Sequence, residues 1–298
     1  MFDSVIAIVV SYNCDQGFHE RMNTLQEVGV DILIVDNGSE IVGKTIVEQH
    51  ASANKVFTLL NPENMGIAYA LNQGVRYALQ HGYKWILSLD QDSLVTPGMI
   101  ETMCNVYESL GEEEKKITAG LFAVPVEKAI ARVGDYKSDS NNTNFTKVIT
   151  GITSGNLLRT DIFNKVGLFE EKLFIDYVDH DFYLRLASVG YHLLECEGAK
   201  LIHQRGNYTQ KKIFGRLTEI SNYSALRRYY NTRNRMYTWK RYAESHPDFV
   251  QHDKKTFRKQ LLKLLLVEDD KWSKLKMMTK GYCDYKRGSY GKYTGVSL

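Results

Sequence analysis

The first 90 residues alternate four short apolar runs with stretches of helical pattern, and this alternation constrains the fold more than any other feature of the chain. The runs span Val5–Tyr12, Ile32–Val35, Val56–Leu60 and Trp85–Asp90, and helical periodicity separates them, most clearly between residues 67 and 78. Short strands that alternate with helices are typical of an α/β fold with right-handed crossovers and a ligand at the carboxyl ends of the strands. We therefore predict a mostly parallel sheet flanked by helices.

Polar side chains follow each of the four runs. They are Asn13, Asp36 to Ser39, Asn61 and Asn64, and finally Asp90 and Asp92. Because the carboxyl ends of parallel strands share one edge of a sheet, we expect them to line a common site. Neither G-x-G-x-x-G nor G-x-x-x-x-G-K-[ST] occurs, which argues against a dinucleotide-dependent dehydrogenase and a P-loop NTPase. Asp36 could accept a hydrogen bond from a pyrimidine ring N–H, although a simple turn explains this stretch equally well.

The run WILSLDQDS, residues 85–93, ends in two acids that are one residue apart. Asp90 and Asp92 can both turn toward a hard divalent cation, which prefers oxygen ligands and keeps positions open for the phosphates of a substrate. We therefore predict that Mg2+ or Mn2+ binds there and holds a diphosphate. A polar turn is the alternative explanation of the two acids. A helix is predicted next, with Thr96 as its N-cap and Pro97 at its first position.

Beyond residue 93 the alternation weakens. The pattern predicts a helix over 97–110, a strand over 117–124, an exposed Asn-rich loop over 135–146, and a turn of small residues that enters a strand over 150–158. Small residues in that turn would let a substrate approach the backbone, whereas a β-turn with a bulge requires no ligand.

The segment FIDYVDHDFYLR, residues 174–185, is a second candidate for chemistry. Its pattern is helical from Asp179 onward, and Asp179 lies at the N-terminal edge of the apolar face. Asp181 and Arg185 stand at i, i+4, so an ion pair explains them. Asp176 is explained equally well as an N-terminal cap of the helix or as a substrate ligand.

Two further short strands are predicted over 192–196 and 199–204, and His203 lies near the end of the second. A single histidine is more often structural than a metal ligand. A histidine that follows a strand can nevertheless complete a cation site begun by two aspartates.

The net charge of +3 conceals two parts of opposite sign. Residues 1–204 contain about 16 basic and 27 acidic side chains, whereas residues 205–298 contain about 22 basic and 8 acidic ones. The second part is predicted to form helices with basic and aromatic faces over 227–242, 257–267 and 271–278. Such helices suit either an anionic membrane surface or packing as a cap on the core. The acidic first part argues against nucleic acid as a partner.

Cysteine content and hydropathy bear on location. The four cysteines are scattered without a C-x-x-C pair, which favours a reducing cytosol over a disulfide framework or a zinc ribbon. The stretch MFDSVIAIVVSYN has no basic leader, and no apolar run reaches the length of a membrane span. We therefore expect a cytoplasmic protein that is peripheral on the inner face of the cell membrane.

Several segments, in order, resemble the inverting family 2 glycosyltransferases of the GT-A fold, which is Rossmann-like. They are IVVSYN, IVDNGS, NPENMGIAYALNQG, LSLDQDS, the SGNLL turn and FIDYVDHDFYLR. The sequence is most similar to bacterial rhamnosyltransferases of surface polysaccharide synthesis, in which DQDS replaces a plainer DxD and YYxxRN follows the catalytic domain. The resemblance covers about residues 4–240 and implies a catalytic domain over 1–205, with its donor half ending near residue 95, and a helical extension over 206–298.

The resemblance also assigns residues to the nucleotide. It implies that Asp36 contacts the pyrimidine ring, with Ser11 and Asn13 beside it. Asn64 and Gly66 would lie near the nucleotide.

For the chemistry, the resemblance implies that Asp90 contacts the ribose and the metal, that Asp92 binds the metal, and that His203 is a metal ligand as in some members. Asp179 matches the catalytic base of the family. The chain departs from the usual Glu-Asp pair with Val178-Asp179, which leaves the roles of the neighbouring acids, Asp176 and Asp181, open.

These residues support a single inverting displacement, in which a carboxylate deprotonates the acceptor hydroxyl and a cation stabilises the diphosphate leaving group. The resemblance implies TDP-L-rhamnose as the donor, and a glycan or a lipid-diphosphate-linked saccharide as the acceptor. A UDP-hexose donor and a non-catalytic nucleotide-binding module are the alternatives. A nucleotidyltransferase is disfavoured because SYNCDQG replaces a glycine-rich, basic phosphate loop. Whether the chain forms a homo-oligomer is left open.

Overall fold

The computed structural model describes residues 4–127, 137–203, 209–213, 216–220 and 222–295. The chain forms two compact units. The first comprises Met1–Glu171 and Asp179–Gln204, and the second comprises Lys172–Val178 and Arg205–Leu298. The short segment Lys172–Val178 therefore belongs to the second unit although the chain on both sides of it belongs to the first.

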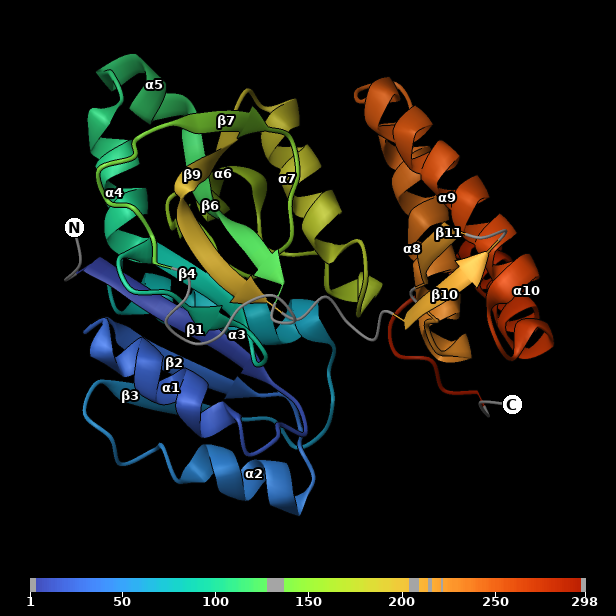
Figure 1. Cartoon of the computed structure of the whole chain (residues 1–298), viewed down its shortest axis with the longest axis horizontal. Helices are drawn as coiled ribbons and strands as arrows, with labels where there is room; N and C mark the ends of the chain where they lie inside the picture. The colour runs from blue at the N-terminus through green and yellow to red at the C-terminus, as the bar shows by residue number, and fades with distance from the viewer. Residues whose placement is uncertain (1–3, 128–136, 204–208, 214–215, 221, 296–298) are drawn as a thin grey trace. The chain divides into compact units, whose positions relative to one another are not determined.

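Four parallel strands form one half of the sheet in the first unit (Figure 1). They are β1 (Val5–Ser11), β2 (Asp31–Asp36), β3 (Val56–Leu60) and β4 (Trp85–Asp90), in the order β3-β2-β1-β4. All four coincide with the predicted apolar runs. The strands β1, β2 and β4 are buried on both faces, as expected for parallel strands that are covered by helices.

Three helices cover the two faces of this half-sheet: α1 (Phe18–Glu27), α2 (Ile41–Glu48) and α3 (Ile67–Gln80). Val5, Ala7 and Val9 of β1 share a core cluster with apolar residues of α1 and α2. On the opposite face, α3 lies so close to β1 that a Cβ atom on Gly74 would be 2.5 Å from Ile8 Cγ2. The glycine in the sequence ALNQG therefore permits the close contact between helix and sheet.

The second half of the sheet is built from shorter and more varied elements. In chain order they are β5 (Leu94–Val95), α4 (Met99–Ser109), α5 (Glu112–Ile117), β6 (Thr118–Glu127), β7 (Phe145–Val148), β8 (Asn156–Arg159), α6 (Phe163–Val166), α7 (Val178–Ser188) and β9 (His192–His203). The strand β8 runs antiparallel between β4 and β6, and β6 pairs with β9 in parallel. Among the described residues the sheet has nine strands, in a mixed arrangement that is parallel in its first half.

The predicted start of α4 was wrong. The helix begins at Met99, and its N-cap is Gly98 in the left-handed conformation with φ 79°. The Thr96 hydroxyl instead donates a hydrogen bond of 2.6 Å to the Lys200 carbonyl oxygen. Thr96 is therefore used to bind the β9 strand rather than to cap the helix.

The two strands predicted over 192–204 are one strand, β9, which extends to His203. Its register against β6 shifts between Cys196 and Lys200, so the polar break in the pattern is a bulge and not a loop. The predicted loop over 135–146 lies partly outside the described residues, and its end belongs to β7.

The second unit contains a hairpin and three long helices. The elements are β10 (Thr209–Ile213), β11 (Arg216–Ile220), α8 (Ala225–Tyr242), α9 (Pro247–Val267) and α10 (Lys271–Arg287). The three helices were predicted, whereas the antiparallel hairpin was not. In the part of the chain that the structure describes, no helix has both the length and the apolar character needed to cross a membrane.

Candidate active site

Asp36, the last residue of β2, is buried within a hydrogen-bond network at the edge of the sheet. The parallel register places Ser11 beside it, and the Ser11 hydroxyl donates a 3.1 Å hydrogen bond to Asp36 Oδ1. Ser39 donates from its backbone N–H to Oδ2 at 2.9 Å and from its hydroxyl to Oδ1 at 2.5 Å. A carboxylate has about four acceptor positions. The arrangement therefore leaves Asp36 capacity for one further N–H donor.

The thiol beside Asp36 is not a candidate nucleophile. Burial raises the pKa of Cys14 to about 11, and the negative charge of Asp36 contributes to the increase. The thiolate is the reactive form, so a thiol with this pKa remains protonated near neutral pH.

Asn13 ties the end of β1 to the start of α2. Its backbone N–H donates to the Ser39 hydroxyl at 2.7 Å, and its Oδ1 accepts from the Glu40 backbone N–H at 2.7 Å. Its backbone is left-handed, with φ 49°, a conformation that asparagine tolerates better than most residues. The structure thus joins the three predicted residues Ser11, Asn13 and Asp36 in one network.

The loop after β3 closes on this network from the other side. Asn64 Oδ1 accepts from Asn37 Nδ2 at 3.2 Å and from the Gly66 backbone N–H at 3.0 Å. Gly38 has φ 80°, and a Cβ atom there would lie 2.2 Å from the Glu63 carbonyl carbon. The turn after β2 and the loop after β3 are therefore in direct contact, and Asn64 and Gly66 lie beside the Asp36 network.

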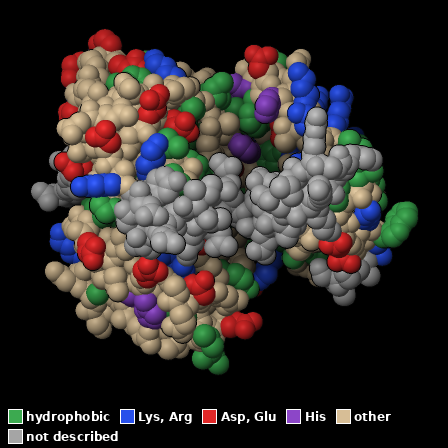
Figure 2. All heavy atoms as spheres, viewed as in Figure 1, with side chains coloured by type: hydrophobic (Ala, Val, Ile, Leu, Met, Phe, Trp, Pro, Cys, Tyr) green, Lys and Arg blue, Asp and Glu red, His purple; other side chains and the backbone are tan. Residues whose placement is uncertain are grey.

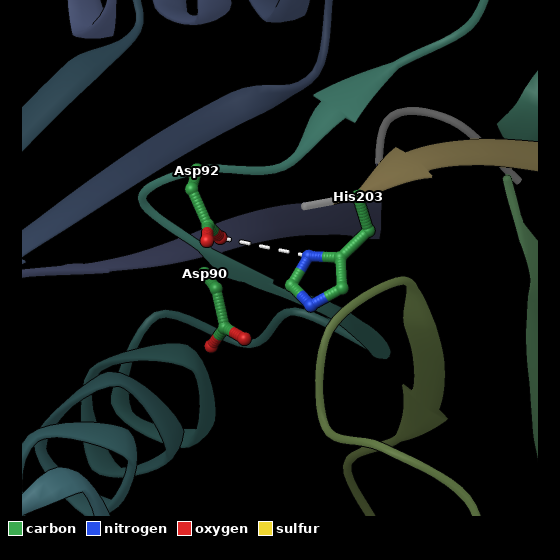
Figure 3. A group of neighbouring side chains, drawn as sticks. All are labelled: Asp90, Asp92 and His203. Atoms are coloured by element: carbon green, nitrogen blue, oxygen red, sulfur yellow. Dashed lines mark ion pairs between the residues drawn. The ribbon is translucent and has the colours of Figure 1, made fainter. Parts of the chain in front are cut away.

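Asp90, Asp92 and His203 form a second group, shown in Figure 3. One potential ligand atom from each residue lies within 4.8 Å of the others. Asp92 Oδ1 is 3.5 Å from His203 Nδ1, which is also 2.8 Å from the Ser93 hydroxyl. The end of β9 thus brings a histidine to acids that lie 111 and 113 positions earlier in the chain.

The geometry of this group fits a divalent cation. Asp92 Oδ1 is buried and has no hydrogen-bond partner among the described residues. A buried carboxylate oxygen without a donor is costly unless a cation or another ligand satisfies it. Two carboxylates suit a hard cation, and an imidazole is a common ligand of transition metals.

Gln91, the residue between the two acids, contacts the end of β1. Its Oε1 accepts a 2.6 Å hydrogen bond from the Tyr12 backbone N–H. This contact links the turn after β4 to the segment that carries Asn13. This role of Gln91 was not predicted. The sequence DQDS indicated only that the chain resembles a family, and it did not indicate which atom Gln91 contacts.

Asp179 lies in the first turn of α7, where its Oδ1 accepts a 2.8 Å hydrogen bond from the His180 backbone N–H. One turn further, Tyr183 is fully buried, and Asn156 Nδ2 donates to its hydroxyl. Burial raises the pKa of Tyr183 well above its usual range, and the negative charges of Asp179 and Asp90 raise it further. One buried phenol therefore experiences both Asp179 and the first acid of the DxD sequence. Tyr183 and Asn156 were not predicted as site residues.

The two neighbouring acids are engaged elsewhere. Asp181 is buried and pairs with Arg185 at 3.0 Å, as predicted, and Arg185 also donates to the carbonyl oxygens of Val166 and Leu168. Asp176 pairs with Arg227 at 3.0 Å.

The model of the family described as Glycosyl transferase family 2 matches residues 6–167, which is more than half of the chain. Asp36, Asp90 and Asp92 lie within the matched residues, whereas Asp179 and His203 lie beyond them. The chain is 29% identical over 244 residues to the dTDP-rhamnosyl transferase RfbF of Shigella flexneri, an alignment that covers 78% of this chain and 79% of RfbF.

Solved structures with the same fold include three glycosyltransferases. GalNAc-T7 with UDP, GalNAc and Mn2+ has a TM-score of 0.58 at 12% identity, and the match covers 84% of this chain but only 50% of GalNAc-T7. Mannosyltransferase PcManGT from Pyrobaculum calidifontis, in complex with GDP-Man and Mn2+, has a TM-score of 0.58 at 14% identity and covers 98% of this chain and 76% of its own. TarS of S. aureus has a TM-score of 0.54 at 13% identity, and the match covers 94% of this chain and 43% of TarS.

These likenesses confirm the predicted GT-A fold, a mixed α/β sheet flanked by helices and followed by C-terminal helices. The sequence match adds the activity that the fold alone leaves unassigned. The chain belongs to glycosyl transferase family 2 and is a glycosyltransferase.

Proposed function

We propose that this protein is an inverting glycosyltransferase that moves L-rhamnose from TDP-L-rhamnose to a hydroxyl of a cell-surface polysaccharide or a lipid-linked oligosaccharide. The observation that carries the proposal is the group of Asp90, Asp92 and His203, whose potential ligand atoms lie within 4.8 Å of one another. Asp92 Oδ1 in this group is buried and has no hydrogen-bond partner among the described residues. A cation site at the carboxyl ends of parallel strands suits a transfer from a nucleotide sugar, whose diphosphate the cation would hold. The rhamnosyl donor is supported by the similarity to RfbF.

Asp90, Asp92 and His203 would hold a divalent cation, Mn2+ or Mg2+. When bound, the cation supplies positive charge that stabilises the diphosphate leaving group. The Oδ1 atom of Asp92 is buried and has no hydrogen-bond partner in the described part of the chain, so we expect this atom to bind the cation directly. The imidazole in the group favours Mn2+ over Mg2+, because Mg2+ prefers oxygen ligands.

Asp179 would accept the proton of the acceptor hydroxyl. The hydrogen bond from the His180 backbone N–H uses Oδ1 and fixes the carboxylate, so that Oδ2 is the atom that would take the proton. One turn later on α7, Tyr183 forms a buried, hydrogen-bonded pair with Asn156. A positioned carboxylate base contributes about 10²- to 10⁴-fold to a rate.

Asp36 would contact the pyrimidine ring of the donor, with Ser11, Asn13, Asn64 and Gly66 close by. Its carboxylate is held by Ser11 and Ser39 in a fixed orientation and has capacity for one more donor, which the ring N–H of thymine or uracil can supply. A pyrimidine diphosphate should therefore bind better than GDP. We also propose that donor-binding residues lie up to about residue 95, that acceptor-binding residues lie in about 96–205, and that 206–298 is an extension.

The donor proposal is tested with purified protein, Mn2+ and a panel of nucleotide sugars. We expect TDP to raise the melting temperature, GDP to leave it unchanged, and TDP-L-rhamnose to be hydrolysed or transferred faster than other donors. Preferential use of a UDP-hexose would contradict the rhamnosyl assignment and support the alternative donor class. Failure of every nucleotide sugar to react, with TDP still bound, would support a non-catalytic binding module.

We further propose that the second unit brings the protein to an anionic membrane surface, where a lipid-diphosphate-linked acceptor would be found. At the end of α9, Leu262, Leu265 and Leu266 are 58%, 46% and 56% exposed and lie on one helical face. The exposed Arg258 and Lys259 lie one turn earlier on that face, and Lys and Arg side chains gather over α9 in Figure 2. Trp272, at the start of α10, is 86% exposed. Apolar and basic side chains on one exposed face are typical of an interfacial helix.

A further inference from the structure

The segment Lys172–Val178, which precedes Asp179, has an unusual backbone. Phe174, Asp176 and Tyr177 have φ values of 67°, 63° and 65°. Residues other than glycine seldom adopt this left-handed conformation, and they keep it only where surrounding contacts enforce it. The helix α7 begins at Val178, the last residue of this segment, and Asp179 is the second residue of the helix.

The contacts that enforce the conformation come from one side chain of α8. Asn234 is fully buried, and its Nδ2 donates to the carbonyl oxygens of Leu173 at 2.8 Å, Ile175 at 2.7 Å and Asp176 at 3.0 Å. Three carbonyl groups within four residues can point toward one amide only if the backbone curls around it. The left-handed residues lie within or next to this curl.

Arg233 fixes which way the Asn234 amide points. Its Nε donates to Asn234 Oδ1 at 3.0 Å, which turns the Nδ2 atom toward the segment. Its Nη2 donates to the Leu173 carbonyl oxygen at 3.1 Å, and its Nη1 donates to the Gly291 carbonyl oxygen at 2.9 Å. The guanidinium therefore connects the amide, the segment and the end of the chain after α10.

Aromatic contacts support the same arrangement. Phe174 stacks on Tyr230, with ring centroids 5.2 Å apart and planes 17° apart. Tyr229, its neighbour on α8, donates from its hydroxyl to Asp284 of α10 at 2.8 Å. Of the four residues that YYxxRN specifies in 229–234, Tyr230, Arg233 and Asn234 thus contact this segment, and Tyr229 joins α8 to α10.

We infer that Asn234, oriented by Arg233, is a positioning residue that fixes the backbone before Asp179 and thereby aims the catalytic base. This inference rests on the proposed function, in which Asp179 is the base. A displacement of the base by about 1 Å is enough to cost about 10²-fold in rate. Because Asn234 lies in the second unit and the donor-binding residues lie in the first, its loss should lower kcat for transfer and leave donor affinity unchanged.

The test compares Asn234→Asp with wild type. Aspartate keeps the shape and the hydrogen bond from Arg233 but cannot donate to the three carbonyl groups. Arg233→Lys is a second variant, which keeps the charge and removes the Nε donor. Glu268→Gln is the matched control, because Glu268 is buried in the same unit and accepts from Arg228 and Lys274, neither of which lies in the segment.

Three quantities are measured for each variant at a temperature where all remain folded: kcat for transfer, the Kd for TDP, and hydrogen–deuterium exchange in peptides that cover residues 172–182. We expect Asn234→Asp to lower kcat by about 10²-fold, to leave Kd unchanged and to raise exchange in these peptides. Arg233→Lys should show the same pattern with a smaller change. Glu268→Gln should lower the melting temperature without either effect.

Two results would overturn the inference. One is an Asn234→Asp protein whose exchange over 172–182 equals that of wild type. The other is a loss of kcat no greater than in Glu268→Gln, with Asp179→Asn inactive in the same assay. If wild type turns over no nucleotide sugar, the proposed function fails instead, and hydrogen exchange still decides whether Asn234 fixes this backbone.

Discussion

Acidic residues of the same chemical type have different tasks here because their partners differ. Asp181 is buried and neutralised by Arg185, so its charge stabilises the fold. Asp92 keeps a side chain that is 43% exposed and an inner oxygen that no described residue donates to, which makes it available to a ligand. The groups that surround an aspartate therefore distinguish one that stabilises the fold from one that can bind a ligand.

The first prediction at this scale concerns Asp92. Asp92→Asn removes one negative charge from the metal group, so we expect turnover to fall by about 10²-fold or more while the melting temperature of the metal-free protein changes little. Calorimetric titration of Mn2+ and of TDP checks it. Asp161→Asn, a surface acid paired with Arg159, is the control and should keep full activity. TDP binding of equal strength in EDTA and in Mn2+ would refute the metal model.

The second prediction separates Asp179 from Asp181. Asp179→Asn should bind TDP normally and lose about 10²- to 10⁴-fold in kcat, because it removes the proton acceptor that we propose. Asp181→Asn should instead lower stability, by about 3 kcal/mol, because it leaves Arg185 without its buried partner. Steady-state kinetics and thermal unfolding distinguish the two. An inactive, stable Asp181→Asn with an active Asp179→Asn would move the base by two positions.

Tyr183 and Asn156 show the limit of prediction for single residues. The pattern of α7 marks Tyr183 as one more buried side chain, and Asn156 as part of a turn of small residues. Their hydrogen bond joins positions that are 27 residues apart and on different elements. Periodicity identifies which face of an element is buried, but it does not identify which buried polar groups meet.

At the scale of elements, the strands with both faces buried could be predicted from local sequence, and so could β3, which is an apolar run although it is only partly buried. The strands β1, β2 and β4 are continuous apolar runs, and their local sequence is sufficient. The strand β7 is only half-buried, with two exposed residues between two partly buried ones, so its sequence resembles a loop. Such edge strands depend on a partner that is distant in sequence.

The bulge in β9 has a physical cause that the sequence does not display. Asp139 donates from its backbone N–H to the Gly198 carbonyl oxygen at 3.0 Å, and Glu197 donates to the Asn144 carbonyl oxygen at 3.0 Å. A Cβ atom on Gly198 would be 2.6 Å from the Asp139 carbonyl oxygen. The loop that precedes β7 therefore crosses β9 at this point, and the polar residues there serve that crossing.

A third prediction concerns the contact between the turn after β2 and the loop after β3. Gly38→Ala places a Cβ atom 2.2 Å from the Glu63 backbone, so the two loops must separate and TDP affinity should fall. Gly29→Ala is the matched control, since Gly29 has a similar φ of 82° but no atom within 4 Å of its Cβ position. The control should lose only the cost of a left-handed alanine, about 1–2 kcal/mol, without a change in TDP binding. Equal TDP affinity in the two variants would contradict this account.

The fourth prediction concerns pH. Burial, with a contribution from the charge of His19, lowers the pKa of His50, whose Nε2 is 2.9 Å from His19 Nδ1. The unfolded chain therefore takes up a proton at a higher pH than the folded one. Stability should be complete above the unfolded value of 6.5 and should decrease as pH falls through it. His50→Gln should flatten the dependence of melting temperature on pH between 7 and 5. An unchanged slope would refute this assignment.

At the scale of the whole molecule, some of the many basic side chains of residues 205–298 form ion pairs within the second unit. Glu268 is buried and pairs with Arg228 and with Lys274 at 3.0 Å. Asp253 accepts from Arg235 at 3.1 Å. The few acids of this region thus hold particular basic side chains in the interior, while others, such as those on the exposed face of α9, remain on the surface.

The fifth prediction tests those surface charges. The full-length protein should bind vesicles that contain anionic lipid at low salt and should dissociate as salt is raised, because each engaged basic residue contributes about 1 kcal/mol and is screened within about 10 Å. The double variant Leu262→Glu, Trp272→Glu should bind several-fold more weakly in flotation. Val189→Glu, which alters an exposed apolar residue of the first unit, should bind as wild type does. No binding of wild type to anionic vesicles would refute the membrane proposal.

The hydrogen bonds from α8 to Lys172–Val178 affect the order in which parts of the chain can fold during translation. Leu173 leaves the ribosome 61 residues before Asn234, its hydrogen-bond partner. Domains form from the N-terminus as the chain emerges, so the sheet, at whose edge we propose that the nucleotide binds, can fold while α8 is still being translated. The backbone beside Asp179 can acquire its final conformation only after Asn234 and Arg233 have been translated. Arg233 also donates a hydrogen bond to the Gly291 carbonyl oxygen, which is translated later still. If these residues have the roles that we propose, a nascent or prematurely terminated chain will bind a nucleotide sugar before it is able to transfer it.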